Sequence, residues 1–271
     1  LLLILCLVLI KSGGSENEAF FTRISFVLVG LWWIGFAQIT FRRLPNNIYN
    51  KKTEKNLIRK SFKELKLISK ELFSDKKLRI YLYSFFFFSL GMQTIFLIAA
   101  LFGQSQIGLP TEKLIMTILL IQIEAIIGAW LFSFLSGKIG NRNTLLIGIG
   151  IWVIVCLIGY FIDKNHPQVE MQFYTMAALV GLVMGGIQPL ARSTYAKLLP
   201  ETEDNTIYFS FYDVFEKVAL CIGLFIFGLF IEMTDGMKAS TLAMGASFLI
   251  SFIFMCFLKT KKSNVEKVSS I

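Results

Sequence analysis

Apolar stretches long enough to cross a lipid bilayer are the feature that most constrains the fold of this chain. A helix needs about 20 apolar residues to span the hydrocarbon core. Because lipid offers no hydrogen-bond partners to the backbone, only helices and closed barrels span it. The spans that we predict lie at 20–41, 78–102, 114–135, 144–162, 172–199, 207–231 and 239–258. The sequence therefore predicts an all-α membrane protein.

The first ten residues are also apolar, but this run is too short to span a bilayer on its own. It has neither the charged start nor the small-residue cleavage site of a signal peptide. We predict that 1–10 is the end of a spanning helix. Residues 1–41 would then be the end of an N-terminal transmembrane bundle, and the helices that precede Leu1 would be partners of this chain.

The net charge of +9 is concentrated in one part of the sequence. Of the 27 lysines and arginines, 13 fall between Arg42 and Arg79. This connection lies on one side of the membrane together with 138–142, 192–204 and the tail 259–271, and the loops on the other side carry few cations. Because cytoplasmic loops are enriched in Lys and Arg, we predict that this side and the C-terminus are cytoplasmic. The charge therefore reflects membrane topology, and we expect no nucleic-acid partner.

The basic connector at 42–77 contains a predicted helix of its own, at 54–73. Its apolar residues form a narrow stripe flanked by lysines and arginines. That pattern is typical of a helix on anionic membrane headgroups, and it equally fits a linker helix packed under the protein. A six-helix bundle at 78–258 follows. Two such bundles joined by a long cytoplasmic loop make a twelve-helix major facilitator, and a seven-helix protein is the alternative.

Three charged residues interrupt the apolar span at 207–231, namely Asp213, Glu216 and Lys217. Each costs about 2.5–3.5 kcal/mol at the centre of a membrane helix, so they must face protein or water. Asp213 and Lys217 stand four residues apart and can neutralise each other. At a similar depth, Arg192 is predicted to contact Asp213 or Glu216 and to close the cytoplasmic side. The alternative is a static cluster that locks two helices together.

A stripe of small and then polar residues follows one side of the preceding span. Its members are Gly181, Gly185, Gln188, Arg192 and Tyr195. Small residues in such a stripe permit close helix approach. Pro189 removes a backbone hydrogen bond, so we predict a kink in this helix.

Two isolated polar side chains lie near the middle of other spans. Glu124 stands among apolar neighbours, where a carboxyl can carry a proton; a structural hydrogen bond or a pairing with Lys217 are the alternatives. Gln93 can hydrogen-bond a polar solute or the next helix. No metal-ligand spacing, phosphate-binding glycine loop or nucleophile–base pair is found, so we expect no metal, no cofactor and no enzyme.

The short loop at 135–144 resembles the signature loop of the major facilitator superfamily. In that loop an acid, a Lys or Arg, a Gly and further cations form a conformational latch. Lys138, Gly140 and Arg142 match the pattern, whereas Gly137 stands where the acid usually lies.

Two later segments carry a more specific resemblance. Residues 185–201 read GGIQPLARSTYAKLLPE, and residues 208–217 read YFSFYDVFEK. They resemble a branch of the major facilitator superfamily that includes the vacuolar amino-acid effluxers and their bacterial relatives. The Gly-Gly-x-Gln, Arg-Ser-x-Tyr, Pro-Glu and Phe-x-x-Tyr-Asp…Lys elements appear in order. Pro189 departs from the pattern, because relatives usually have a small residue there.

This resemblance implies a secondary transporter of a bacterial plasma membrane that exports amino acids or similar small polar solutes by alternating access, with protons as the candidate coupling ion. The positions that it carries over are Gln188, Arg192, Tyr195, Tyr212, Asp213 and Lys217. One alternative is a lipid or peptidoglycan-fragment carrier of the same fold, which a broad apolar groove would favour. Another is a membrane scaffold whose charges form a network sealed from water.

Overall fold

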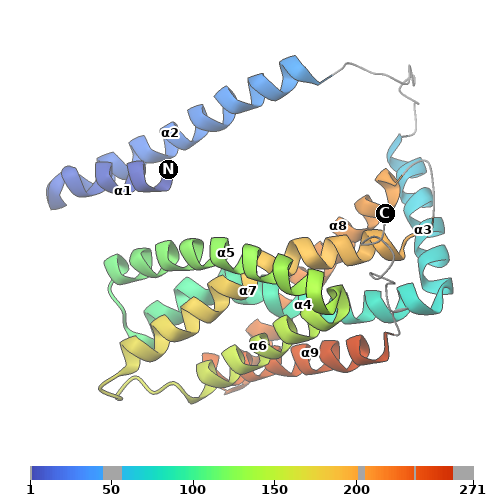
Figure 1. Ribbon diagram of the computed structural model, residues 1–271. Helices are drawn as coiled ribbons and strands as arrows, with labels where there is room; N and C mark the ends of the chain where they lie inside the picture. The colour runs from blue at the N-terminus through green and yellow to red at the C-terminus, as the bar shows by residue number, and fades with distance from the viewer. Residues whose placement is uncertain (1, 45–56, 201–204, 235, 259–271) are drawn as a thin grey trace, which may run out of the picture. The chain divides into compact units, whose positions relative to one another are not determined.

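The computed structural model describes residues 2–44, 57–200, 205–234 and 236–258, and these are helical apart from short loops. Residues 45–56 of the connector, residues 201–204 and the predicted tail at 259–271 lie outside the described residues. The elements are α1 (Leu2–Ser12), α2 (Gly14–Arg43), α3 (Leu57–Ser74), α4 (Lys76–Phe102), the short π-helix η1 (Gly103–Ile107), α5 (Thr111–Ile139), α6 (Asn141–Phe161), α7 (Val169–Leu198), α8 (Thr206–Thr234) and α9 (Met237–Phe257) (Figure 1).

Seven helices in the described part of the chain, α2 and α4 to α9, are long and apolar enough to cross a membrane. The prediction of an all-α, multi-pass membrane protein is thereby confirmed. By its internal contacts the chain divides into two units, Leu1–Leu57 and Ile58–Ile271. The division into an N-terminal bundle end, a connector and a C-terminal bundle stays a prediction.

In the first unit, α1 folds back and packs along α2. The residue between them is Gly13, where a Cβ would lie 2.0 Å from the ring of Phe21. Only glycine leaves room for that ring at the turn. Most of α2 is exposed, including Phe26 and Trp33, so its apolar surface requires lipid or further protein around it.

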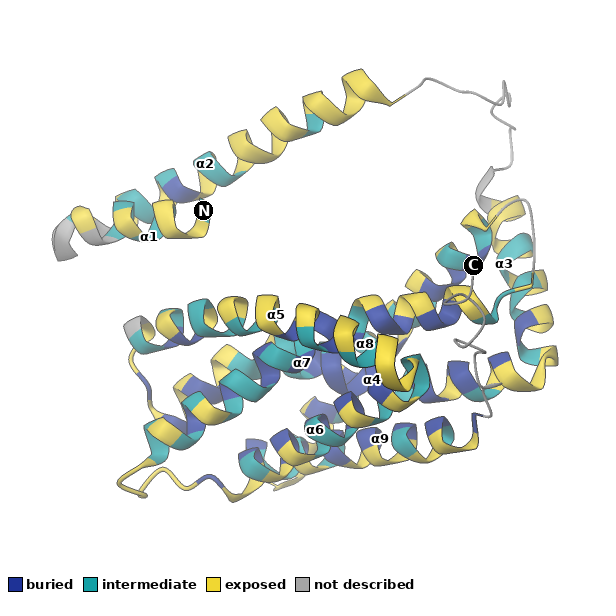
Figure 2. Cartoon of the chain, viewed as in Figure 1, coloured by how far each residue is buried: buried dark blue, intermediate teal, exposed yellow. Residues whose placement is uncertain are grey.

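In the second unit, α5 packs on α7, α4 lies against α8 and α9, and α6 joins α7 to α9. Buried residues gather on the sides of the helices that face one another (Figure 2). Two serines fasten α4 to α9, because Ser84 donates its hydroxyl to the backbone oxygen of Ser251 at 2.9 Å and Ser251 returns the bond at 2.7 Å. Small hydroxyl residues are common at such membrane-helix contacts.

Glycines bring α5 and α7 into close contact. A Cβ on Gly185 would lie 1.8 Å from the backbone oxygen of Ala125, and a Cβ on Gly181 would lie 2.7 Å from that of Ile121. No side chain fits at such distances. The prediction that this stripe permits close helix approach is confirmed.

Helix α3 lies crosswise to the spans at one end of the second unit (Figure 1). Its second half packs on the bundle, since Leu72 is buried and Leu65, Ile68 and Phe73 contact the core. The ring of Phe73 meets that of Phe215 on α8 at 6.1 Å between centroids. Of the two arrangements that the sequence left open, packing under the protein therefore describes the second half of α3.

Candidate functional site

An ion pair joins the end of α7 to the start of α8. Arg192 lies six residues before the end of α7, and Asp213 lies seven residues after the start of α8. At 1.5 Å per residue, each is about 10 Å from its helix end. Arg192 Nη1 is 3.4 Å from Asp213 Oδ1, and both side chains are 52% exposed. The predicted contact is confirmed, and Asp213 is the partner.

Aromatic rings hold the Arg192 guanidinium in place. Its Cζ lies 5.1 Å from the ring centroid of Phe209 and 5.8 Å from that of Tyr212. Both distances allow cation–π attraction. Tyr212 is itself buried, and its ring stacks on Phe85 of α4 at 4.2 Å. The rings of Phe209 and Tyr212 on α8 therefore hold the guanidinium beside Asp213.

Buried tyrosines support this layer from within the bundle. Tyr195 donates its hydroxyl to the backbone oxygen of Tyr208 at 2.9 Å, which links α7 to the first turn of α8. Tyr81 of α4 donates to the backbone oxygen of Ala191 at 2.6 Å. The rings of Tyr195 and Tyr212 lie 4.9 Å apart. Tyr195 thus positions the two helices that carry the ion pair.

The side-chain amide of Gln93 on α4 donates a hydrogen bond to Glu216 on α8. The sequence left open whether Gln93 would meet a solute or the next helix, and the structure shows the second. Thr94 bonds the backbone oxygen of Leu90 in its own helix at 2.7 Å. Gln188 lies close by, with Nε2 3.9 Å from the sulfur of Met92.

Lys217 does not pair with Asp213, contrary to the sequence prediction. Arg192 comes from the neighbouring helix and already neutralises that carboxylate. Among the described residues no ion pair joins Lys217 to another side chain. Instead, Lys217 lines a shallow groove on the surface of α8 together with Asp213 and Cys221.

Glu124 lies half-buried in the middle of α5, beside α7. A Cβ on Gly181 would come within 2.8 Å of the Cβ of Glu124. In the part of the chain that the structure describes, no hydrogen bond or ion pair reaches its carboxyl group. The suggested pairing with Lys217 is therefore absent.

The loop that the sequence predicts at 135–144 is reduced to a tight turn at Gly140, because α5 continues to Ile139 and α6 begins at Asn141. The first turn of α6 is attached to α9. Gly140 takes a φ of +82°, which favours glycine. Arg142 donates to the backbone oxygens of Met255 at 3.2 Å and Cys256 at 2.7 Å, and thereby satisfies carbonyls at the end of α9. Lys138 lies 4.4 Å from the ring centroid of Phe134. A latch function for these residues stays a prediction.

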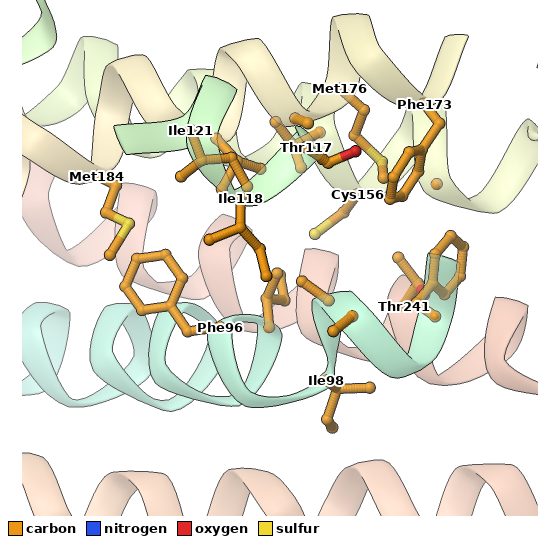
Figure 3. A pocket seen from close by; sticks show the side chains of 18 of the residues that line it. Phe96, Ile98, Thr117, Ile118, Ile121, Cys156, Phe173, Met176, Met184 and Thr241 are labelled. Carbon is orange, nitrogen blue, oxygen red and sulfur yellow. The ribbon is translucent and has the colours of Figure 1, made fainter. Parts of the chain in front are cut away.

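A cavity of about 280 Å³ lies between the other ends of the helices (Figure 3). Phe96, Ile118 and Met184 contribute from α4, α5 and α7. Among its lining side chains only Thr117, Thr241 and Cys156 carry a polar atom or sulfur besides the methionines. The space is therefore almost wholly apolar, unlike the charged region near Arg192.

Comparison with known sequences identifies the family. Residues 1–268 match the sequence model of a family described as vacuole effluxer Atg22 like. The chain belongs to this family. The resemblance inferred from the motifs at 185–201 and 208–217 is confirmed. The family's description is that of an effluxer and not of an enzyme.

Curated relatives come from bacteria and fungi. The chain is 28% identical to the uncharacterized MFS-type transporter YxiO of Bacillus subtilis (strain 168), over 89% of this chain and 55% of the relative. It is 26% identical to autophagy-related protein 22 of Cryptococcus neoformans var. neoformans serotype D (strain JEC21 / ATCC MYA-565), over 87% of this chain and 44% of the relative. The chain spans about half the length of these relatives.

Sequence reasoning does not single out Phe85 or Asn141, although both make contacts between helices. Phe85 belongs to a run of four phenylalanines at 85–88, and its ring stacks on that of Tyr212. Asn141, next to Arg142, accepts hydrogen bonds from Ser136 at 2.8 Å and from Lys197 at 3.2 Å. In a continuous run of phenylalanines, helical spacing does not show which ring faces a functional residue. That Phe85 contacts Tyr212 follows only from the packing of α4 on α8.

Proposed function

We propose that the whole protein is a secondary transporter that exports small polar solutes, with amino acids as the leading candidates, by alternating access. The observation that carries the proposal is the Arg192–Asp213 pair, half-exposed about 10 Å inside spanning helices. Charged side chains within spanning helices are unfavourable where they face lipid. This face of the second unit therefore borders water or protein, as the wall of a solute path does.

The charges on this face suit a zwitterionic solute. Arg192 and Lys217 offer donors to a carboxylate, and Asp213 and Glu216 offer acceptors to an ammonium group. Hydrogen bonds between such ionised groups are about twice as strong as neutral ones. Because Lys217 has no ion-pair partner among the described residues, its charge is open to a solute.

For coupling, we propose that Glu124 carries the proton. It is half-buried in mid-span, and no described side chain engages its carboxyl group. Intramembrane carboxylates of this kind serve as proton relays in pumps and transporters. The proposed cellular location is a bacterial plasma membrane, with the C-terminus in the cytoplasm. In this proposal residues 1–41 end an N-terminal bundle and residues 78–258 form the C-terminal bundle.

The names of the relatives support transport. One is called an MFS-type transporter and the family is described as vacuole effluxers. Because this chain spans about half of its relatives, the proposal concerns the complete protein, in which a second bundle supplies the other wall of the path.

The test is flux through the complete protein in liposomes. A labelled amino-acid mixture is followed with and without a pH gradient, for the unaltered protein and for Asp213→Asn and Glu124→Gln. Glu170→Gln is the matched control, because Glu170 pairs with Lys113 at the opposite end of the bundle. Gradient-driven flux that Asp213→Asn abolishes supports the proposal. Flux that survives both substitutions assigns these charges a structural role.

A second candidate is a carrier of a lipid or peptidoglycan fragment. The apolar cavity between α4, α5 and α7 favours it, because an acyl or isoprenoid chain would fit such a lining. Liposomes that move a labelled lipid-linked fragment but no amino acid would favour this carrier. If the liposomes transport neither solute, and water-soluble reagents do not reach Arg192, Asp213 and Lys217, the membrane scaffold is favoured.

A further inference from the structure

The first half of α3 extends its apolar face beyond the part of the helix that packs on the bundle. Phe62, Leu65 and Leu72 lie on one face, at helical spacings of three and seven residues. Leu72 is 1% exposed, whereas Phe62 is 69% exposed. The bundle therefore covers the second half of this face, and the described residues of the second unit leave Phe62 largely uncovered.

A row of cations flanks this apolar face. Arg59, Lys63, Lys66 and Lys70 follow steps of four, three and four residues, and all four are exposed. The start of α4 adds the exposed cations Lys76, Lys77 and Arg79. On α3 the acidic residues are Glu64 and Glu71, which lie on the opposite flank, and Glu71 accepts a hydrogen bond from Tyr208 at 3.0 Å.

The direction of α3 places this surface at the edge of the membrane. The spans define the membrane normal, and α3 runs crosswise to them where α4 begins (Figure 1). Its buried face is turned toward the bundle, on the side where the membrane lies. Phe62, on the same face, is thereby directed to the boundary between headgroups and acyl chains. Lysine and arginine side chains beside it reach headgroup level.

We propose that the first half of α3 binds anionic phospholipids, with Phe62 among the acyl chains and the cations Arg59, Lys63, Lys66 and Lys70 at the phosphates. A row of one charge sign fits a surface of the opposite sign, and the attraction grows with each added Lys or Arg near an anionic leaflet. The proposal is independent of the transported solute.

Lipid binding at this surface would also bear on the ion pair. The second half of α3 is tied to α8 by the hydrogen bond between Glu71 and Tyr208, five residues before Asp213. A lipid that fixes α3 therefore fixes the turn of α8 on which the aromatic and ionic contacts of Arg192 depend.

The test is hydrogen–deuterium exchange on the complete protein in nanodiscs of phosphatidylcholine, with or without phosphatidylglycerol. We expect the amides of 59–67 to exchange more slowly in discs with phosphatidylglycerol. The effect should disappear in a variant that combines Lys63→Gln, Lys66→Gln and Lys70→Gln. High salt should weaken it, because exposed charges are screened. Leu67→Ser, on the outward face of α3, is the matched control and should keep the effect.

A photo-crosslinking amino acid in place of Phe62 gives the second readout. A lipid adduct at this position supports the proposal. An adduct to another part of the protein shows that this face is an internal interface, and it overturns the proposal. Equal exchange in both kinds of nanodisc, unchanged by the combined lysine variant, overturns it as well.

Discussion

At the scale of single residues, two cations could form an ion pair with Asp213, and only one of them does so in the structure. Lys217 is four residues away on the same helix, whereas Arg192 comes from α7 and makes the ion pair. Arginine presents several donors in a planar fork and stacks on aromatic rings, and here it rests against Phe209 and Tyr212. Lys217 is thereby left with its charge available.

For the ion pair, we expect Arg192→Gln and Asp213→Asn each to abolish flux while the thermal midpoint in detergent falls little. Exposed ion pairs contribute about 0–1 kcal/mol, and both side chains are half exposed. The double variant removes both charges and distinguishes two roles. If the double variant restores flux, each charge is needed only to neutralise the other, and the proposed contact with a solute is wrong.

For the contact between α6 and α9, we expect Arg142→Ala to lower the free energy of unfolding by about 1–3 kcal/mol. The substitution leaves the backbone oxygens of Met255 and Cys256 without their donor. Arg142→Lys is the control, since it keeps a cation at the end of α9, where the helix dipole favours one. Thermal melting in detergent measures both. Equal melting of Arg142→Ala and the unaltered protein would contradict this role.

At the scale of helices, packing is decided by where side chains are missing. The stripe on α7 contacts the backbone of α5 at Gly181 and Gly185, and Gly128 of α5 lies equally close to the backbone of α7. Lipid provides no hydrophobic force between helices, so close backbone contact has to hold them together. Whether Pro189 bends α7 stays a prediction; the helix continues through it to Leu198.

We expect Gly185→Ala to destabilise the bundle, because its Cβ would lie 1.8 Å from the backbone oxygen of Ala125. Overpacking of this kind costs about 1–3 kcal/mol. Gly228→Ala on α8 is the matched control, since no atom lies within 4 Å of its Cβ position. Thermal melting of the two variants in one detergent makes the comparison. A similar midpoint for both would show that α5 and α7 separate readily.

At the scale of the whole molecule, the second unit gathers its cationic ends on one side. Asn141 and Arg142 at the start of α6 contact the end of α5, the end of α7 and the end of α9 there. The Lys113–Glu170 pair lies at the other end. This arrangement follows from short loops between antiparallel spans.

We expect a cysteine at Gly137 to be shielded in intact cells and a cysteine at Asn165 to react with a membrane-impermeant maleimide. Both positions are exposed and lie at opposite ends of the bundle, Gly137 in the last turn of α5 and Asn165 in the loop between α6 and α7. The cation-rich end is predicted to be cytoplasmic. The substitutions are made after replacement of the four native cysteines. Labelling of Gly137→Cys but not of Asn165→Cys would contradict the predicted topology and place the cation-rich end outside the cell.

The sequence by itself determined the class of the protein, its spans, its family and the depth of its charged residues. Apolar length and the position of Lys and Arg act locally, and they can be read without knowing which helices touch. For the same reason, the equal depths of Arg192 and Asp213 predicted their contact, and the spacing of Gly181 and Gly185 predicted close packing.

Only the tertiary structure decided which partner each polar group takes. Gln93 meets Glu216 across two helices, Glu124 meets no polar side chain in the described residues, and Lys217 loses Asp213 to Arg192. Helical spacing fixes the side of a helix on which a residue lies, but the neighbour on that side comes from a distant part of the chain. Packing of α4, α7 and α8 supplied those neighbours, and with them the proposed site.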